Sequence, residues 1–181
     1  MGRTRNPDPV LLFISTLYSN NDTFYRSKEI LEKNFGDVLF ISPSLTWEYS
    51  TYYKDEIGWP LYRQLIFFQK LIDPGVLADV KLRTNEIELS LSLEGKRSIN
   101  LDPGYLTLSK VVLASTKNYA HRIYLGKGIY GEVTLIYKKS MYKPHLFTYK
   151  DYQDKTHIDI FMKAREMLKN KFKEGKYGIY R

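Results

Sequence analysis

Six residues between positions 102 and 132 carry side chains that can bind anions or move protons: Asp102, Lys110, Lys117, His121, Arg122 and Glu132. Lysine and arginine bind phosphate groups, histidine exchanges protons near neutral pH, and carboxylates orient a histidine or hold Mg²⁺. Together these types predict a site that binds or processes a small phosphorylated or nucleotide-like ligand. Lys110, Lys117 and Arg122 would hold the anion. His121 would serve as acid or base, with Asp102 and Glu132 orienting it or holding Mg²⁺.

Asp102 also has a simpler interpretation, because it begins the stretch Asp102-Pro103-Gly104. Proline fixes φ, glycine tolerates a positive φ, and an aspartate often caps such a turn, so local chemistry predicts a chain reversal here. A strand over 106–114 would then place Lys110 on one face with apolar neighbours. An amine there needs a carboxylate or an anionic ligand, unless it reaches water at the sheet edge.

The stretch "LGKGIYG" predicts a hairpin turn through Gly126 and Gly128. His121 and Arg122 would lie on one arm and Glu132 on the other, as cross-strand neighbours. Such a group fits a functional site, and it fits a surface ion-pair cluster equally well.

A helix over 75–95 would carry apolar residues on one face and a polar stripe on another. The stripe has spacings of three and four and consists of Lys81, Thr84, Asn85 and Glu88. It is typical of a solvated helix face, and as a functional face it would offer amide and hydroxyl groups besides charges.

Several classes of protein are excluded by missing patterns. No P-loop, G-x-S-x-G or H-E-x-x-H motif is present, no G-x-G-x-x-G opens a helix, and the three histidines have no zinc-site spacing. The absence of cysteine excludes disulfides, thiol catalysis and zinc held by thiolates. With no signal-peptide pattern and no apolar run near the roughly 18 residues of a membrane span, we expect a cytoplasmic protein that does not enter a membrane.

The net charge of +8 raises a second hypothesis, an RNA-binding accessory protein. Residues 163–181 hold seven Lys or Arg and two Glu, so most of the excess lies in the C-terminal helix and tail. A structural or interaction module is the third hypothesis. The lysine-rich, cysteine-free composition is also compatible with a thermophilic source. The sequence decides neither between enzyme and binding protein nor on the reaction or the oligomeric state.

The order of expected strands and helices along the chain predicts a single α+β domain over 1–181, which would position these residues. Its first half reads as a ferredoxin-like βαββαβ unit, with strands near 10–19 and 37–48, helices near 21–36 and 75–95, and a strand at 61–72 that could also be a short helix. An antiparallel β-meander from 98 to 152 and a basic helix at about 156–173 follow. A helix at 61–72 or 106–116 would change this topology.

Five segments of the chain resemble the signature segments of an uncharacterised bacterial family catalogued as domain of unknown function 4416: "EIGWPLYR", "TNEIE", "NLDPGYL", "VVLASTKNYAHRIYLGKGIYGEVTLIY" and "FTYKDY". The resemblance spans nearly the whole chain and implies one domain with no established activity. It also selects twelve polar positions for a ligand or catalytic site: Arg63, Lys81, Thr84, Asn85, Glu88, Asn100, Asp102, Lys110, Lys117, His121, Arg122 and Glu132.

Overall fold

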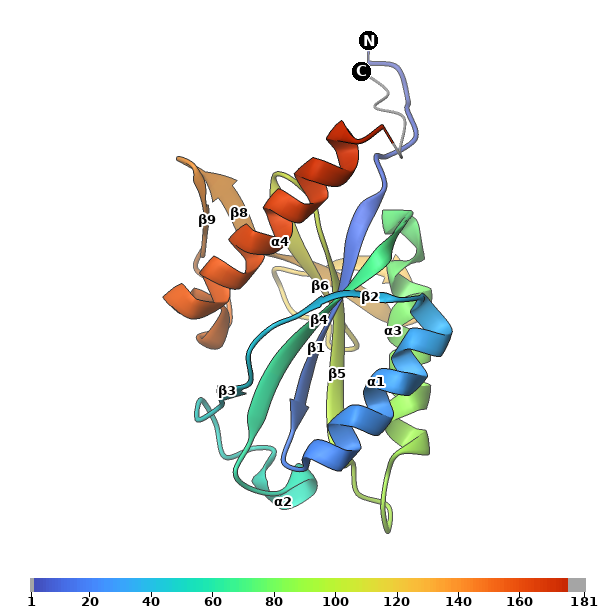
Figure 1. Ribbon diagram of the computed structural model, residues 1–181, viewed down its shortest axis with the longest axis vertical. Helices are drawn as coiled ribbons and strands as arrows, with labels where there is room; N and C mark the ends of the chain where they lie inside the picture. The colour runs from blue at the N-terminus through green and yellow to red at the C-terminus, as the bar shows by residue number, and fades with distance from the viewer. Residues whose placement is uncertain (1, 176–181) are drawn as a thin grey trace.

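Nine antiparallel strands form one sheet in the computed structural model, which describes residues 2–175 (Figure 1). The strands are β1 (Val10–Tyr18), β2 (Val38–Ile41), β3 (Leu45–Thr46), β4 (Tyr62–Ile72), β5 (Ile99–Leu106), β6 (Lys110–Ser115), β7 (Ile123–Gly126), β8 (Ile129–Lys138) and β9 (Met141–Lys143). The helices are α1 (Asn21–Phe35), α2 (Lys54–Ile57), α3 (Leu77–Ser90) and α4 (Lys155–Lys173), with 3-10 turns η1 (Pro74–Val76) and η2 (Asp151–Gln153).

The strand order is β2-β4-β1-β5-β6-β8-β7, while β3 pairs with β4 and β9 pairs with β8. Strand β1 therefore runs through the middle of the sheet, and all nine of its residues are buried. This burial explains its nearly continuous apolar sequence, since a strand covered on both faces does not alternate with polar residues.

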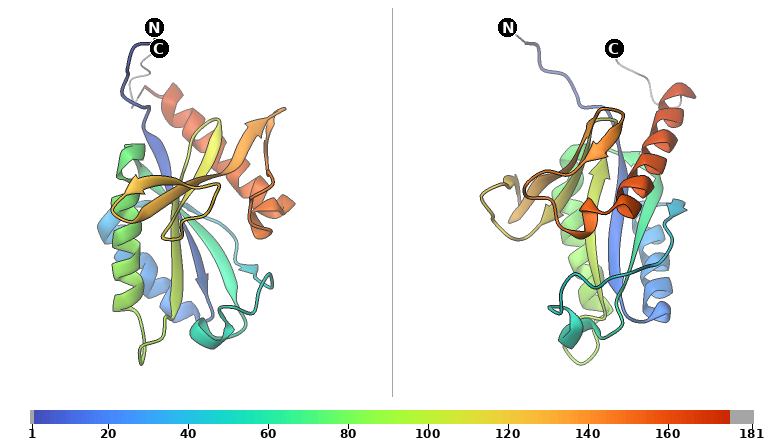
Figure 2. Two further views of the ribbon diagram at one scale, coloured as in Figure 1. Left: turned by 180° about the vertical axis from the view of Figure 1, so that it is seen from behind. Right: turned by 90° about the vertical axis from the view of Figure 1, so that its left-hand side faces the viewer.

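Two apolar cores hold the helices against opposite faces of the sheet. Leu12 and Ile14 of β1 belong to the core that packs under α1 and α3. Leu11 and Phe13 belong to the core that packs under α4, whose apolar stripe includes Phe161. Side chains alternate along a strand, so neighbouring residues of β1 supply both layers. Helix α3 runs alongside β5 in both views of Figure 2.

The structure confirms the α+β class, the C-terminal helix and the strand at 61–72, which is β4. The hairpin through Gly126 and Gly128 is also confirmed, as the turn between β7 and β8. The strands after residue 98 do not form a simple meander, because β8 lies between β6 and β7. Helix α4 begins at Lys155 after the N-cap residue Asp154, one residue before the predicted start at about 156.

The predicted turn at Asp102-Pro103-Gly104 is wrong, because all three residues lie inside β5. They pair with Ser15, Ile14 and Phe13 of β1, respectively. Gly104 is required here by a close approach: a Cβ would lie 2.6 Å from Cζ of Phe13 and would also collide with the carbonyl oxygen of Val112 on β6. The glycine therefore serves strand packing, and not chain reversal.

No helix within residues 2–175 combines the length and apolar character needed to cross a lipid bilayer.

Candidate functional site

The candidate site lies where β5 and β6 separate. These strands pair only between Gly104–Leu106 and Val111–Leu113, although β5 begins at Ile99 and β6 continues to Ser115. Residues 99–103 of β5 therefore have β1 on one side and no strand on the other. We call this opening between residues 99–103 and residues 114–117 the fork.

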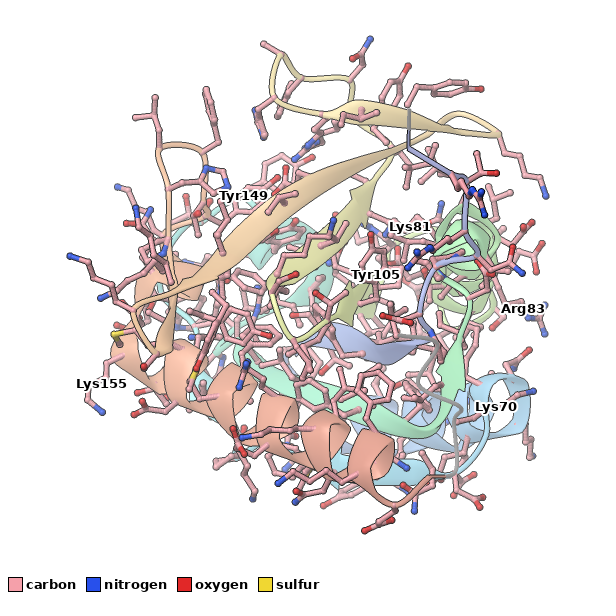
Figure 3. All side chains as sticks on the ribbon, turned by 90° about the horizontal axis from the view of Figure 1, so that it is seen from above. Lys70, Lys81, Arg83, Tyr105, Tyr149 and Lys155 are labelled. Carbon is pink, nitrogen blue, oxygen red and sulfur yellow. The ribbon has the colours of Figure 1, made fainter. Side chains whose placement is uncertain are left out.

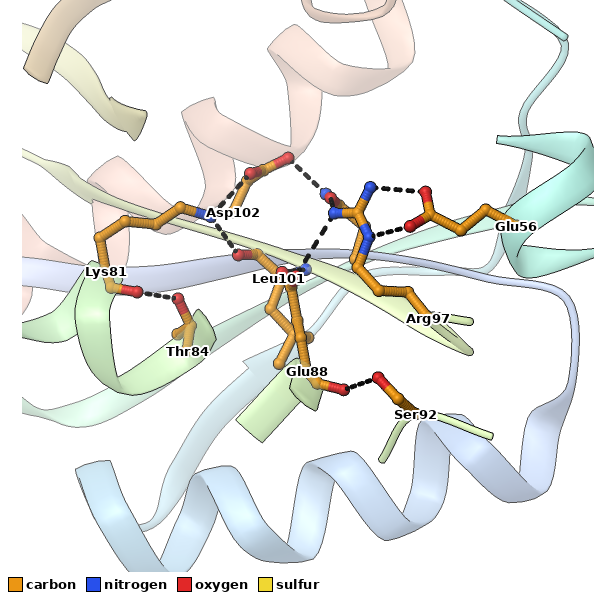
Figure 4. A network of polar contacts seen from close by, with 9 residues as sticks. Glu56, Lys81, Thr84, Glu88, Ser92, Arg97, Leu101 and Asp102 are labelled. Atoms are coloured by element: carbon orange, nitrogen blue, oxygen red, sulfur yellow. Dashed lines mark hydrogen bonds and ion pairs between the residues drawn. The ribbon is translucent and has the colours of Figure 1, made fainter. Parts of the chain in front are cut away.

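Side chains of α3 take the place of the missing strand at the fork (Figure 4). Glu88 Oε1 accepts a hydrogen bond from the Leu101 amide at 2.6 Å, and Lys81 Nζ donates to the Leu101 carbonyl at 2.9 Å. Both backbone groups of Leu101 are thus satisfied, as buried polar groups must be. This explains why Lys81 and Glu88 are buried on α3.

Asn100 and Asp102 lie two residues apart on β5, so their side chains share one face of the strand. Lys81 Nζ lies 3.2 Å from Asp102 Oδ1, and Asn100 Nδ2 donates to Asp102 Oδ2 at 2.7 Å. Burial opposes the charge of this carboxyl, but nearby Lys81 and Arg63 outweigh it and lower the pKa of Asp102. The Asp102 side chain is 35% exposed, so an ionised carboxylate is presented at the fork.

Arg97 closes the end of the fork near α2. Its guanidinium makes a two-pronged contact with Glu56, through Nε at 2.7 Å and Nη2 at 2.6 Å, and Nη1 donates to Asn100 at 3.1 Å. Glu88 Oε2 also accepts from Arg97 at 3.4 Å. Burial nevertheless raises the pKa of Glu88, although Lys81 and the Leu101 amide favour its charged form. Two carboxyls at one site therefore have pKa values displaced in opposite directions.

The fork opens into a cavity of about 500 Å³. Its polar lining from the strands, α3 and the connections around them comprises Arg63, Lys81, Asn85, Glu88, Arg97, Asn100, Asp102, Ser115, Thr116, Lys117, Arg122 and Glu132. Two loops complete it, one before α2 with Trp47, Tyr49, Ser50, Tyr52 and Tyr53, and one around η2 with Tyr149, Lys150, Asp151 and Tyr152. Lys81 and Tyr149 approach the strands from different sides when the molecule is seen from above (Figure 3).

A buried ion pair forms the wall on the β8 side. Arg122 Nε donates to Glu132 Oε2 at 2.7 Å, and both side chains are almost fully buried. The other guanidinium nitrogens of Arg122 donate to Ser115 Oγ at 2.8 Å and Tyr149 Oη at 2.5 Å. These contacts fix the β6–β7 connection and the loop before η2 to the same strand.

His121 lies behind this wall and does not line the cavity. Its Nε2 is 2.9 Å from Glu132 Oε2, and its ring stacks on Phe147 with the centroids 4.5 Å apart. The histidine therefore touches the cavity only through Glu132.

Arg63 anchors the η2 loop from the opposite wall. Its guanidinium bonds Asp151, which also accepts a 3.1 Å hydrogen bond from Trp47 Nε1. The guanidinium carbon of Arg63 lies 5.5 Å from the centroid of the Trp47 ring and 5.7 Å from that of the Tyr152 ring. Burial would weaken the positive charge of Arg63, but Asp151, Tyr152 and Asp102 together outweigh this effect and raise the pKa of the guanidinium. Both loops of the cavity are thus tied to β4.

Two lysines of the lining have no carboxylate partner within residues 2–175: Lys117 after β6 and Lys150 before η2. Lys117 Nζ lies 5.6 Å from the centroid of the Tyr52 ring. Both lysines are exposed, so they lie at the mouth of the cavity and the paired charges lie deeper. Nearby, burial raises the pKa of Tyr53 to about 12, which keeps its hydroxyl neutral.

The structure places nine of the twelve predicted positions in the lining: Arg63, Lys81, Asn85, Glu88, Asn100, Asp102, Lys117, Arg122 and Glu132. The other three lie elsewhere. His121 is behind Glu132, and Thr84 Oγ1 is buried against the Lys81 carbonyl at 3.0 Å. Lys110 is exposed at the start of β6, which lies between β5 and β8 and not at the sheet edge.

Sequence reasoning missed Arg97, Trp47 and the η2 pair Asp151 and Tyr152. Arg97 and Asp151 lie in segments without periodicity, so no local pattern marked them. The aromatic-rich stretch at 47–53 was the one available signal, because a loop seldom carries so many rings unless they cover something.

The lining does not fit a dedicated metal centre. Among the described residues no three His, Asp or Glu side chains gather as ligands would. Asp102 and Glu132, the carboxylates considered for Mg²⁺, already contact Lys81 and Arg122.

A family model described as "Domain of unknown function (DUF4416)" matches residues 8–168. No curated protein and no solved structure matches the chain.

Proposed function

This chain belongs to the DUF4416 family, a domain of unknown function. We propose that its cavity binds or processes a small phosphorylated or nucleotide-like ligand. The observation that carries the proposal is the cavity at the fork, where two lysines without a carboxylate partner among residues 2–175 lie at the mouth and tyrosine and tryptophan rings form a wall. Its volume of about 500 Å³ falls within the range of small-ligand sites.

The anionic part of the ligand would lie at the mouth. Lys117 and Lys150 supply two cations there that no carboxylate neutralises within the described chain, and lysine ammonium groups bind phosphate. Tyr52, Tyr53 and Tyr149 supply flat surfaces for a base or for the apolar face of a sugar.

The two carboxyls of the fork support processing of the ligand as well as binding. Burial raises the pKa of Glu88, while Lys81 and Arg63 lower that of Asp102 against the effect of its burial. Groups displaced in this way can serve as proton donor and proton acceptor in one site at the same pH. In this proposal His121 is a positioning residue that acts through Glu132, since it contacts the cavity only through that carboxylate.

We also propose that residues 1–181 form a single domain whose first half is a ferredoxin-like unit. The order β2-β4-β1-β5, with α1 and α3 on one face, supports this arrangement.

RNA binding by the basic helix has no comparable support. In α4, Lys163 lies over the Phe40 ring and Arg165 Nε donates to the Leu108 carbonyl at 2.8 Å, so both pack against the body. Residues 176–181 of the basic tail lie outside the described residues.

The proposal is tested by thermal shift and calorimetry with nucleoside monophosphates, nucleoside diphosphates, sugar phosphates and inorganic phosphate. We expect at least one phosphorylated compound to stabilise the wild-type protein. Lys117→Ala should weaken its binding at least about ten-fold, because a charge-assisted contact contributes about 1.5–3 kcal/mol.

Lys110→Ala is the matched control, since it also removes an exposed lysine at an end of β6 and lies outside the cavity. Its affinities should equal those of the wild type. An unchanged melting temperature across the whole panel would refute the proposal, and so would equal losses in the two variants.

A further inference from the structure

We propose that Asp102 recognises a pair of neighbouring hydroxyl groups, so that the ligand enters the fork with a ribose-like diol first and leaves its phosphate at the mouth. The inference rests on the proposed function and names the class of ligand more narrowly, as a phosphorylated ribose or ribonucleotide. It follows from the acceptor positions of Asp102, the charges around it and the position of the unpaired lysines.

The Asp102 carboxylate has acceptor capacity left over. Its described contacts use one position on each oxygen, Lys81 on Oδ1 and Asn100 on Oδ2. A carboxylate oxygen accepts two hydrogen bonds, so one position on each oxygen remains for a ligand. Because 35% of the side chain is exposed and the residue lines the cavity, these positions are within reach of a molecule in the fork.

The charges around Asp102 select neutral donors. An anion is disfavoured because Asp102 is itself ionised, and its lowered pKa shows that the charged form is stable there. An ammonium group is disfavoured because Lys81 already lies 3.2 Å from Oδ1 and Arg63 acts on the same carboxylate. Hydroxyl groups meet both conditions.

Two free positions on adjacent oxygens match two hydroxyls on adjacent carbons. A carboxylate also hydrogen-bonds the ribose 2′-hydroxyl at the dinucleotide sites of the Rossmann fold. Asn85 and Asn100 also line the cavity and offer further amide groups to a sugar.

The positions of the cations give the ligand a direction. Asp102 lies within β5, whereas Lys117 and Lys150 belong to the connections that border the mouth. A molecule with hydroxyls at one end and phosphate at the other satisfies both regions at once, and the rings of Tyr52 and Tyr149 line the same cavity.

The test compares compounds that differ by one hydroxyl: ribose 5-phosphate with 2-deoxyribose 5-phosphate, and adenosine 5′-monophosphate with its 2′-deoxy form. We expect the wild-type protein to bind the ribo compound of at least one pair about ten-fold or more tightly by calorimetry. Asp102→Asn should bring that ratio close to one, because an amide cannot accept on both atoms. Lys117→Ala should weaken both members of a pair equally and leave the ratio intact.

The wild-type ratio is measured first, so the inference stays testable even if Asp102→Asn fails to fold. Equal wild-type affinities for ribo and deoxy compounds would overturn the diol inference and leave the proposed function standing. A ratio unchanged in folded Asp102→Asn would do the same, and so would binding confined to phosphates that lack a diol. If no phosphorylated compound binds at all, the proposed function itself fails.

Discussion

The ammonium group of Lys81 on α3 lies 3.2 Å from the carboxylate of Asp102 on β5, and this pair joins a helix to a strand at the point where the sheet opens. Lys81 also bonds the Leu101 carbonyl at 2.9 Å. One side chain therefore satisfies a backbone group that has no strand partner and holds a candidate ligand-binding acid in its charged form.

Replacement of Lys81 should destabilise the fold. Lys81→Met keeps the length of the side chain but leaves the Leu101 carbonyl and Asp102 without their donor, which should cost about 1–3 kcal/mol. Urea unfolding at pH 7 measures the loss. Lys110→Met, at an exposed lysine, should change stability by less than about 0.5 kcal/mol. Equal effects of the two substitutions would contradict the role given to Lys81.

Asp102 should make stability fall in acid. Its pKa is lowered in the folded protein, so its contribution is present above the ordinary value of 3.8 and is lost as the pH falls from there toward the folded value. The difference in unfolding free energy between wild type and Asp102→Asn should therefore shrink below about pH 3.8. A difference that stays constant down to the acid limit of the folded state would argue against a charged Asp102.

Glu88 should show the opposite dependence. Burial raises its pKa, so its contribution is fully present below the ordinary value of 4.5 and is lost as the pH rises through the folded value. The stability of the wild type relative to Glu88→Gln should decline as the pH is raised above about 4.5. Matched urea titrations of both proteins give this difference, and an increase with pH would refute the assignment.

Gly104 should tolerate no side chain. In Gly104→Ala the new methyl group meets the Phe13 ring and the Val112 carbonyl oxygen, and the overpacking should cost about 1–3 kcal/mol or more. The control is Gly2→Ala, because a Cβ at Gly2 has no neighbour within 4 Å. Thermal unfolding of the two variants compares them, and an unchanged melting temperature for Gly104→Ala would mean that β5 and β6 separate more readily than the structure indicates.

Arg122 should be essential to the wall on the β8 side. Arg122→Met leaves the buried Glu132 carboxylate, whose side chain is 3% exposed, without its arginine partner. The substitution should lower the free energy of unfolding by about 3–5 kcal/mol. Adding Glu132→Gln should recover part of that loss, which a double-mutant cycle in urea would measure. Arg83→Met, which breaks the exposed pair with Glu86, should cost less than about 1 kcal/mol. Additive losses at Arg122 and Glu132 would contradict a direct coupling.

Long periodic segments were predictable from the sequence. The apolar run of β1, the alternating β8 and the stripe of α4 each bury a face that their own residues define. The family was also predicted from its segments, and the match over residues 8–168 confirms it. These features are local, so a single chain carries enough information to reveal them.

The candidate site was only partly predictable, because its members meet through tertiary contacts. The stripe of Lys81 and Glu88 reads as a solvated face until β5 is seen beside it. Lys110 and Lys117 share one stretch of sequence, yet only Lys117 lines the cavity, since β6 carries the two lysines to opposite ends. Turn statistics failed at Asp102-Pro103-Gly104 because they describe isolated segments and not a strand held by β1.

Pro103 helps to keep β5 and β6 unpaired at the fork. The amide and carbonyl of Leu101 point away from β1, and two residues further along a strand the backbone points the same way, so the Pro103 nitrogen faces the fork. A proline nitrogen has no hydrogen to donate. Pro103 therefore cannot donate a backbone hydrogen bond that would extend the pairing of β5 with β6 beyond Gly104. The missing N–H group of Pro103 thus helps to keep the cavity open. If β5 and β6 paired along their whole length, the fork would have no room for a ligand.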